Sequence, residues 1–189
     1  MAAPKLDRTP PPPLPPGLRA LSDNKLILRG REWVSDEWRY IDEDPTGSSL
    51  ALIFPLARWQ AERDQWWSWA GRLGVRIGPA DKIGVLASDL KRLALVAVEF
   101  PNAGDGRGYS HARLLRERYR FTGEIRAVGY VKRDQLFFQA RCGFDAFELS
   151  AGEKPDEVLN AFKDFDTAYQ TLPDHSLHLK RRDTLARVK

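Results

Sequence analysis

The middle of the chain alternates between short apolar runs and segments in which apolar residues follow a helical spacing. The clearest run, residues 93–100 (LALVAVEF), is continuous and rich in aliphatic residues, which predicts a strand buried on both faces. Similar runs predict strands at residues 50–54, 75–77, 124–128 and 146–149. Apolar positions three or four residues apart predict helices at residues 57–70, 82–91, 110–120, 133–141 and 155–169.

This alternation predicts an α/β fold. Five strands, each followed by a helix, make βα units, so we expect a mainly parallel sheet with right-handed crossovers. A closed barrel of the usual kind needs eight strands, and five predict an open sheet or a partial barrel. We expect the first helix to bury one face, formed by Trp59, Arg63, Trp66, Trp67 and Ala70.

A β-hairpin flap is predicted ahead of the alternating part. Residues 26–28 and 32–34 flank Gly30, which suits the turn. Aromatic and apolar residues near the hairpin could pack it onto the body of the protein or form a surface for stacking bases. No basic stripe accompanies them, so packing is favoured for Trp33, Trp38, Tyr40 and Ile41.

The two ends of the chain lack periodic apolar residues. Seven prolines by position 16 predict a disordered leader at residues 1–20, with recognition as a polyproline ligand less favoured. Residues 174–189 hold five of the 30 basic and two of the 26 acidic side chains, so they supply +3 of the net charge of +4. We therefore predict the leader at 1–20, the hairpin flap at 21–44, an α/β domain at 45–173 and a mobile basic tail at 174–189.

Charge and composition narrow the class of protein. Outside the tail the charge is nearly balanced, which ranks a nucleic-acid-binding regulator low. No apolar run approaches the roughly 20 residues that span a bilayer, and prolines stand where a signal segment would be apolar. A single cysteine, Cys142, excludes an internal disulfide and a Cys-clustered metal site. We expect a cytoplasmic protein with no membrane partner.

The glycine-rich loop after the strand at 93–100 is the main candidate for a functional site. The predicted fold places this loop and the following helix N-terminus at the carboxyl edge of the sheet. Its backbone N–H groups, with Arg107 and Arg133, would suit a small oxyanion such as sulfite, sulfate or phosphate. In the favoured alternative, Asp105 and Arg107 pair with each other or cap the helix, which shapes a tight turn between the strand and the helix. The candidates for anion or partner binding are Asp105, Gly106, Arg107, Gly108, Tyr109, Ser110, Arg133 and Asp134.

The usual cofactor motifs are incomplete in this loop. A dinucleotide fingerprint that begins at Gly104 fails at Tyr109, one that begins at Gly106 fails at His111, and no P-loop motif occurs. The three histidines form no metal set, so neither a cofactor nor a metal is identifiable. No nucleophile elbow surrounds Ser110, which we expect to cap the helix.

Cys142 and Tyr109 are the candidates for catalysis. Cys142 ends a predicted helix beside Arg141, and a nearby cation lowers the pKa of a thiol and raises its reactivity. A helix C-terminus disfavours the thiolate, and a lone cysteine is usually a small buried apolar side chain. A structural role for Cys142 is therefore favoured over a redox role.

Residues 100–149 carry a family resemblance. Three stretches, Asp105–Ser110 (DGRGYS), Arg133–Leu136 (RDQL) and Arg141–Asp145 (RCGFD), resemble the signature of a bacterial domain of unknown function, family 934. That family is often labelled an oxidoreductase involved in sulfite reduction. The likeness extends over about residues 33–169, and this chain has Ala103 where the family typically has an aromatic residue. Members tend to be encoded beside sulfite reductase and the reductase of activated sulfate, which implies a pathway for this chain.

These observations predict an α/β accessory protein of sulfite reduction in assimilatory sulfate metabolism, acting through the surface at Asp105–Ser110. Its expected partners are sulfite reductase or the reductase of activated sulfate. The alternative is an oxidoreductase or another enzyme of sulfur assimilation, in which Arg107 and Arg133 bind an oxyanion and Cys142 or Tyr109 contributes chemistry. A nucleic-acid-binding regulator ranks third.

Overall fold

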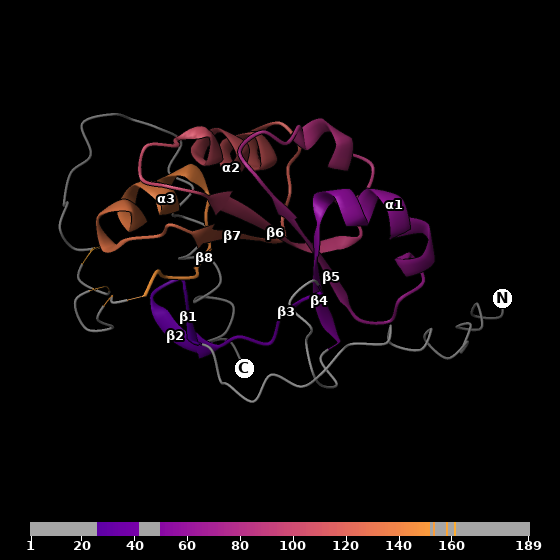
Figure 1. The fold of residues 1–189 in the computed structure, drawn as a ribbon, viewed down its shortest axis with the longest axis horizontal. Coiled ribbons are helices and arrows are strands. Elements are labelled where there is room, and N and C mark those ends of the chain that lie inside the picture. Colours follow the sequence, from indigo (N-terminus) through magenta and orange to yellow (C-terminus); the bar gives the residue numbers. More distant parts are fainter. Residues whose placement is uncertain (1–25, 42–49, 152, 154–157, 159–160, 162–189) are drawn as a thin grey trace, which may run out of the picture.

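The computed structural model describes residues 26–41, 50–151, 153, 158 and 161. Within them, eight strands form one sheet in the order β2-β1-β8-β7-β6-β5-β4-β3 (Figure 1). The strands are β1 (Leu26–Arg29), β2 (Glu32–Ser35), β3 (Arg39–Tyr40), β4 (Ala51–Pro55), β5 (Arg72–Ile77), β6 (Leu93–Phe100), β7 (Glu124–Gly129) and β8 (Ala146–Phe147).

The central strands of the sheet are parallel and follow one another in chain order. Consecutive strands from β3 through β8 pair in parallel, while β1 pairs antiparallel with both β2 and β8. The sheet curls, so that the N-terminal strands lie below its middle strands in the view of Figure 1. The prediction of a mainly parallel α/β fold with an N-terminal hairpin is confirmed at this level, whereas five βα units are not confirmed.

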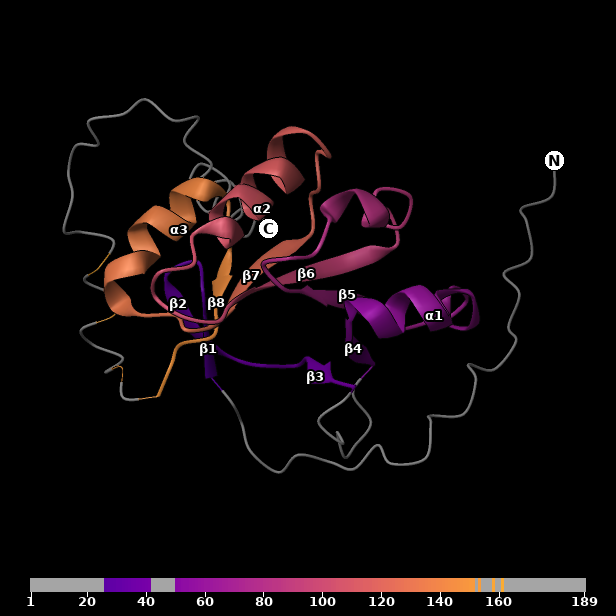
Figure 2. The same cartoon turned by 45° about the horizontal axis from the view of Figure 1, so that its top comes forward.

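The helices cover one face of the sheet (Figure 2). They are α1 (Leu56–Trp66), α2 (Arg107–Glu117), α3 (Leu136–Cys142) and the short 3₁₀ helices η1 (Ile83–Leu86) and η2 (Arg133–Gln135). The prediction of a helix at residues 82–91 is wrong, because this segment forms only the short 3₁₀ helix η1, followed by turns. Gly84 lies inside that turn, and glycine disfavours a longer helix. The helix predicted at 155–169 lies outside the described residues except for Val158 and Ala161, which are buried.

Helix α1 ends earlier than predicted, and this changes which tryptophans are buried. Trp59 and Trp66 are buried as expected, but Trp67 is 47% exposed and Ala70 is also exposed. Because the helix stops at Trp66, the chain turns and buries Trp69 against Trp66, with ring centroids 5.4 Å apart. No helix in the described part of the chain is long and apolar enough to cross a membrane.

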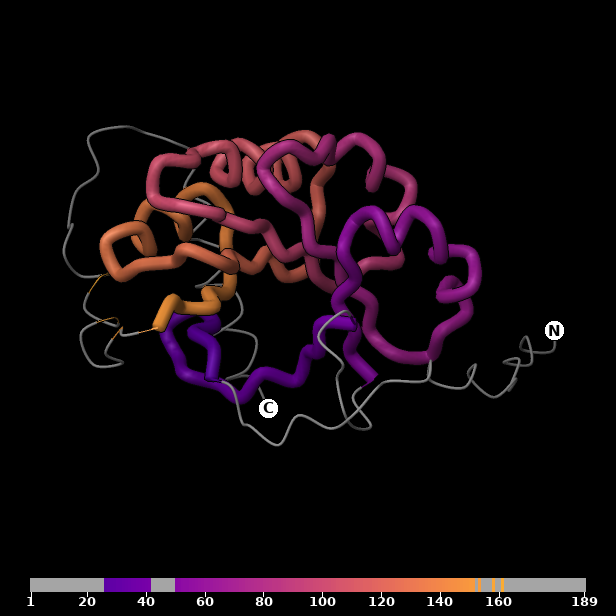
Figure 3. The backbone as a smooth tube through the Cα atoms, viewed as in Figure 1, coloured from indigo at the N-terminus to yellow at the C-terminus, as the bar shows by residue number. Residues whose placement is uncertain are grey.

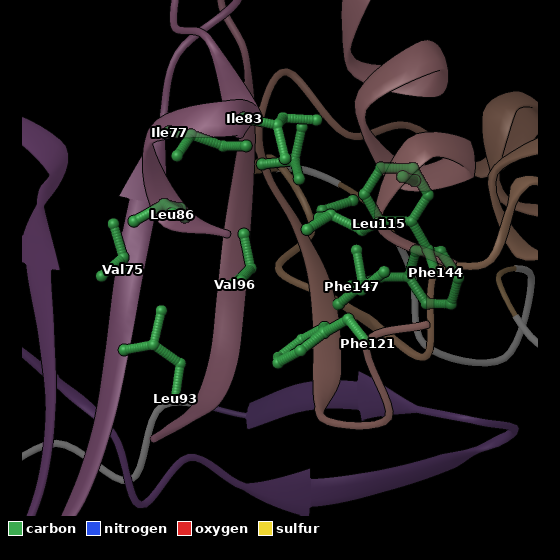
Figure 4. Close-up of a cluster of buried hydrophobic side chains, with 14 of the residues drawn as sticks. Val75, Ile77, Ile83, Leu86, Leu93, Val96, Leu115, Phe121, Phe144 and Phe147 are labelled. Atoms are coloured by element: carbon green, nitrogen blue, oxygen red, sulfur yellow. The ribbon is translucent and has the colours of Figure 1, made fainter. Parts of the chain in front are cut away.

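The main core lies between the sheet and its helices (Figure 4). Strand β6 has the same bounds as the apolar run in the sequence, and Val96 and Val98 point into this core. Phe144 and Phe147 extend it beneath α2 and α3. Full burial of such a side chain stabilises the fold by roughly 1.5–3 kcal/mol.

The opposite, concave face of the sheet is covered by the chain itself. The segment after β2 runs across this face to β3, as the tube in Figure 3 shows. Trp38 and Tyr40 from this segment pack against Ile53, Leu95 and Ala97 of the sheet. The predicted packing of the N-terminal aromatic residues onto the body is therefore confirmed. The hairpin, however, continues the main sheet through β1–β8 pairing instead of forming a separate flap.

Candidate functional site at the carboxyl edge of the sheet

Helix α2 starts at Arg107, three residues before the predicted start. The Asp105 carboxylate accepts hydrogen bonds from the backbone N–H of Arg107 (3.1 Å) and from its side chain, at 2.9 Å from Nε and 2.6 Å from Nη2. These hydrogen bonds lower the pKa of Asp105 and raise the pKa of Arg107. The structure thus shows the pairing of Asp105 with Arg107 that shapes the turn.

The remaining loop residues have roles different from those predicted. Gly106, not Ser110, is the N-cap, and Ser110 lies exposed in the first turn of α2. A Cβ atom at Gly108 would lie 2.7 Å from the ring of Phe100. Gly108 therefore allows α2 to pack closely on β6, which explains this glycine without a bound anion.

Aromatic side chains join the loop to α3. The Tyr109 ring lies 5.2 Å from Phe100 and 4.9 Å from Phe138, measured between centroids. Burial raises the pKa of Tyr109, and Cys142 and Asp134 add to this shift. Tyr109 is half-buried, and Phe138 is 44% exposed. We call Asp105, Arg107, Tyr109 and Phe138 the edge surface, because they present a charged pair and adjoining aromatic rings at the carboxyl edge.

Arg133 and Asp134 lie in η2, on the next loop along the sheet. The backbone N–H of Arg133 donates to Glu153 (3.3 Å), and Lys132 forms an ion pair with the same carboxylate (3.2 Å). Asp134 lies in the first turn of η2, close enough to contribute to the raised pKa of Tyr109. The structure therefore brings Asp134 into the neighbourhood of Tyr109.

Cys142 is the last residue of α3 and is 1% exposed. Burial raises the pKa of its thiol to about 11, although Arg113 and Arg141 partly oppose this shift. The thiol is therefore protonated near neutral pH, and a protonated thiol is a poor nucleophile. This environment favours the structural interpretation of Cys142.

The Arg141–Asp145 stretch, prominent in the family resemblance, supports the packing of α2. Arg116 is buried and donates to the carbonyl oxygens of Gly143 (3.0 Å), Phe121 (2.6 Å) and Gly123 (2.8 Å). It also pairs with Asp145, whose carboxylate accepts from the backbone N–H of Ile125 (3.0 Å). Gly143 has a φ of 109°, and a Cβ atom there would lie 2.6 Å from Arg116 Cγ. These contacts hold α2 against the end of α3.

Sequence reasoning missed His111 as a candidate at this edge. Its Nδ1 atom is buried without a hydrogen-bond partner among the described residues. Burial lowers the pKa of His111, while Asp81 and Asp105 oppose and Arg107 adds to the shift. His111 therefore lies among charges from two neighbouring loops. A lone histidine in a helix gives little signal in sequence, because its neighbours come from separate loops.

A polar cluster on the concave face was also missed. Arg126 donates to Asp36 (2.8 Å) and Glu124 (2.9 Å), and Glu124 also accepts from Arg29 (3.0 Å). Arg126 is completely buried. The available signal was the alternation in EIRAV at residues 124–128, which places Glu124 and Arg126 on one face of a predicted strand.

The fold and the edge surface define a mixed α/β protein with a curled, mainly parallel sheet. A family model described as a bacterial protein of unknown function (DUF934) matches residues 74–179. This match spans more than half of the chain, so the chain belongs to that family, as the resemblance over residues 100–149 predicted. No curated protein matches the chain.

Proposed function

We propose that this protein is an accessory protein of sulfite reduction that docks on sulfite reductase through its edge surface. The observation that carries the docking is the combination, at one edge of the sheet, of the exposed Phe138 ring, packed against half-buried Tyr109, and an arginine already paired with a carboxylate. The choice of sulfite reductase as the partner rests on the family resemblance.

The Asp105–Arg107 pair favours docking over oxyanion binding. Two guanidinium nitrogens of Arg107 already face Asp105, at 2.9 and 2.6 Å. Sulfite or sulfate would have to displace or approach this carboxylate, and like charges repel at such distances. Neighbouring Tyr109 and Cys142 both have raised pKa values, so neither supplies an anionic nucleophile near neutral pH.

The composition of the edge surface suits a protein partner. Aromatic residues and arginine are enriched in protein interfaces, and the residues that dominate binding are usually buried anchors surrounded by polar groups. Phe138 provides the exposed anchor, and Tyr109 holds it in place from α2. Asp105 and Arg107 provide charged groups that would set the orientation of the partner.

An enzyme of sulfur assimilation is the second candidate, and His111 is the observation that favours it. Burial lowers the pKa of His111, so its imidazole is neutral near pH 7 and able to accept a proton. Arg107 and Asp105 both influence its pKa, so His111 lies beside the edge surface. In this function His111 would be the general base, and sulfite or sulfate would bind near Arg107.

Binding of the purified protein to sulfite reductase tests the proposed function. Phe138→Ala should weaken binding at least about tenfold, because it removes an aromatic anchor. Leu114→Ala is the matched control, since Leu114 is 40% exposed on α2 and Phe138 is 44% exposed on α3. Calorimetry or surface plasmon resonance would measure both variants. Absence of binding by the wild type, or equal loss in both variants, would overturn docking through this surface.

A further inference from the structure

Aromatic rings reach the surface of the carboxyl edge from more than one loop. Tyr130 follows β7 and is 38% exposed, and its backbone N–H donates to the carbonyl oxygen of Phe100 (2.7 Å), whose ring lies 5.2 Å from that of Tyr109. Phe138 of α3, 44% exposed, packs on the other side of Tyr109. Exposed aromatic rings are surfaces on which proline-rich segments dock, because a polyproline II segment loses little conformational entropy on binding.

The N-terminal leader contains such a proline-rich segment. Six of the seven residues at positions 10–16 (PPPPLPP) are proline. A polyproline II helix has three residues per turn, so Pro10, Pro13 and Pro16 would lie along one edge of it, about 9 Å apart. The sequence therefore offers a stiff row of proline rings.

The leader is attached to the fold at the edge that carries the aromatic rings. Strand β1 starts at Leu26 and runs antiparallel to β8, so Leu26 lies beyond Phe147 toward the carboxyl edge. Just after β8, the backbone N–H of Ser150 donates to the carbonyl oxygen of Val131 (3.0 Å), the residue that follows Tyr130. The start of β1 and the aromatic loops therefore share one edge of the sheet.

The link between the prolines and β1 is long enough to reach the edge surface. Residues 17–25 span at most about 30 Å when they are extended. In the strand order, β8, β7 and β6 follow β1, so β6 lies about 14 Å from β1 at about 4.8 Å per strand. The aromatic rings belong to the loops and helices that follow β6 and β7, which places them within this span.

Charge also matches the leader to this edge. Arg8 and Arg19 flank the prolines. Asp134 is exposed in η2, lies close enough to Tyr109 to affect its pKa, and has no ion-pair partner in the described part of the chain. An arginine at one end of the proline row would pair with this carboxylate and fix the orientation of the leader.

We propose that residues 8–19 bind to the edge surface of the same chain in a polyproline II conformation and compete there with the protein partner. The competition rests on the proposed function, whereas the binding of the leader does not. A short tether gives an effective concentration of about 1 mM, so a contact with a Kd of about 0.1 mM occupies the surface in about nine-tenths of the molecules. The apparent affinity for the partner is then about tenfold weaker.

Paramagnetic broadening in the NMR spectrum of the full chain tests the contact. A nitroxide is attached at position 20 through Ala20→Cys, and the thiol of Cys142 is buried, so it should stay unlabelled. The label should broaden the backbone amide signals of Tyr109 and Phe138. The control is a serine variant of the same labelled chain, which keeps its length and charge and carries Pro10→Ser, Pro13→Ser and Pro16→Ser.

The broadening should be at least about fivefold weaker in the serine variant, because serine does not maintain the polyproline II conformation. Equal broadening in the two chains would overturn the proposal. Broadening that disappears on tenfold dilution would also overturn it, because the leader would then bind a second copy of the chain.

A change in the edge surface gives a second measurement. In the labelled chain, Phe138→Ala should reduce the broadening at Tyr109 at least about threefold, because it removes an exposed ring. Leu114→Ala removes a similarly exposed apolar side chain from α2 and should leave the broadening unchanged. Equal broadening in the two variants would contradict this binding site.

Binding to sulfite reductase separates this proposal from the proposed function. The serine variant should bind sulfite reductase at least about threefold more tightly than the wild type, because its edge surface is not occupied. Equal affinities would overturn the competition. Absence of binding by both chains would overturn the proposed function and the competition with it, while the contact between the leader and the edge surface would stand on the NMR result.

Discussion

Two arginines that pair with carboxylates lie in opposite environments in this protein. Arg126 is completely buried on the concave face and bonds Asp36 and Glu124, whereas the Arg107 side chain at the carboxyl edge is 61% exposed and bonds Asp105. The two sites use the same chemical groups, at donor–acceptor distances of 2.6 to 2.9 Å. Water and salt screen the exposed pair, while the buried groups depend on one another for compensation.

The two arginines also differ in how far away in the sequence their partners lie, and the more conspicuous motif contains the more local ion pair. Arg107 lies in a glycine-rich loop that attracts attention, yet its ion pair is local, because Asp105 is two residues away. Arg126 lies inconspicuously in a strand, and its partner Asp36 is 90 residues away in the sequence. The buried pair therefore joins β7 to the segment that crosses the concave face.

The largest effect is expected for Arg126→Met. This change leaves the carboxylates of Asp36 and Glu124 without their shared buried partner, so the free energy of unfolding should fall by about 3–5 kcal/mol. Arg107→Met is the matched change at the exposed pair and should cost no more than about 1 kcal/mol. Urea unfolding of both variants measures the comparison. Similar losses in the two variants would show that burial does not separate the two pairs.

The contrast between buried and exposed chemistry extends to the thiol of Cys142. Its pKa of about 11 lies two units above the ordinary value of 9.0, so the native thiolate fraction near pH 7.5 should be about a hundredfold lower than in the unfolded chain. Iodoacetamide should therefore alkylate the native protein at least about a hundredfold more slowly than the protein in guanidinium chloride.

The pH dependence provides the check on Cys142. Because folding raises this pKa, the thiol stabilises the native state below pH 9, and this contribution is lost as the pH rises from 9.0 toward about 11. The native alkylation rate should rise about tenfold per pH unit between pH 8 and 10, following the thiolate fraction. A rate that reaches a plateau below pH 8 would instead indicate an activated cysteine.

Two glycines, one in a buried position and one in the exposed loop, allow the same comparison for the backbone. Gly143→Ala should destabilise the protein by roughly 1–3 kcal/mol, because residue 143 has a φ of 109° and the new Cβ would collide with buried Arg116. Gly104→Ala, in the exposed loop, meets only Asn102 Oδ1 at 3.5 Å and should change stability by less than about 0.5 kcal/mol. Thermal unfolding compares the stability of the two variants. Equal losses of stability would contradict the role of Gly143 in holding α2 against the end of α3.

The smallest effect is expected for anions at the edge surface. Because Asp105 already occupies Arg107, sulfite and chloride at matched ionic strength should give equal, weak heats in calorimetric titration. Arg107→Ala should leave these heats unchanged. A saturable sulfite signal that disappears in Arg107→Ala would favour the oxyanion-binding enzyme over the docking protein.

Local patterns in the sequence predicted two kinds of element correctly: strands that are buried on both faces, and turns that are formed by neighbouring residues. The apolar run at 93–100 has the bounds of β6, and Gly30, with a φ of 62°, forms the turn of the predicted hairpin. Helix ends were less predictable. Helix α2 starts at Arg107 because Asp105 binds the first turn, and α1 ends at Trp66 so that Trp69 can join the core.

The candidate site was predicted in part. The sequence placed residues 104–108 in a loop between a buried strand and a helix that starts at about Ser110, and it favoured pairing of Asp105 with Arg107, or capping of the helix, over anion binding. It also favoured a buried Cys142, and Cys142 is buried. It did not indicate that Gly108 packs against Phe100 or that His111 lies among charges from two loops, because these contacts depend on how neighbouring βα units are placed together.

The sequence by itself determined the class of fold, the central strand, the hairpin and the family, because apolar periodicity and turn residues act over a few positions. Only the tertiary structure decided that the hairpin joins the main sheet beside β8 and that residues 36–41 cover the concave face. Glu124 and Arg126 had to share a face of their strand, but their partners Arg29 and Asp36 come from β1 and from the segment after β2. Such pairings are set by the curl of the whole sheet, which brings distant segments together and which no local pattern encodes.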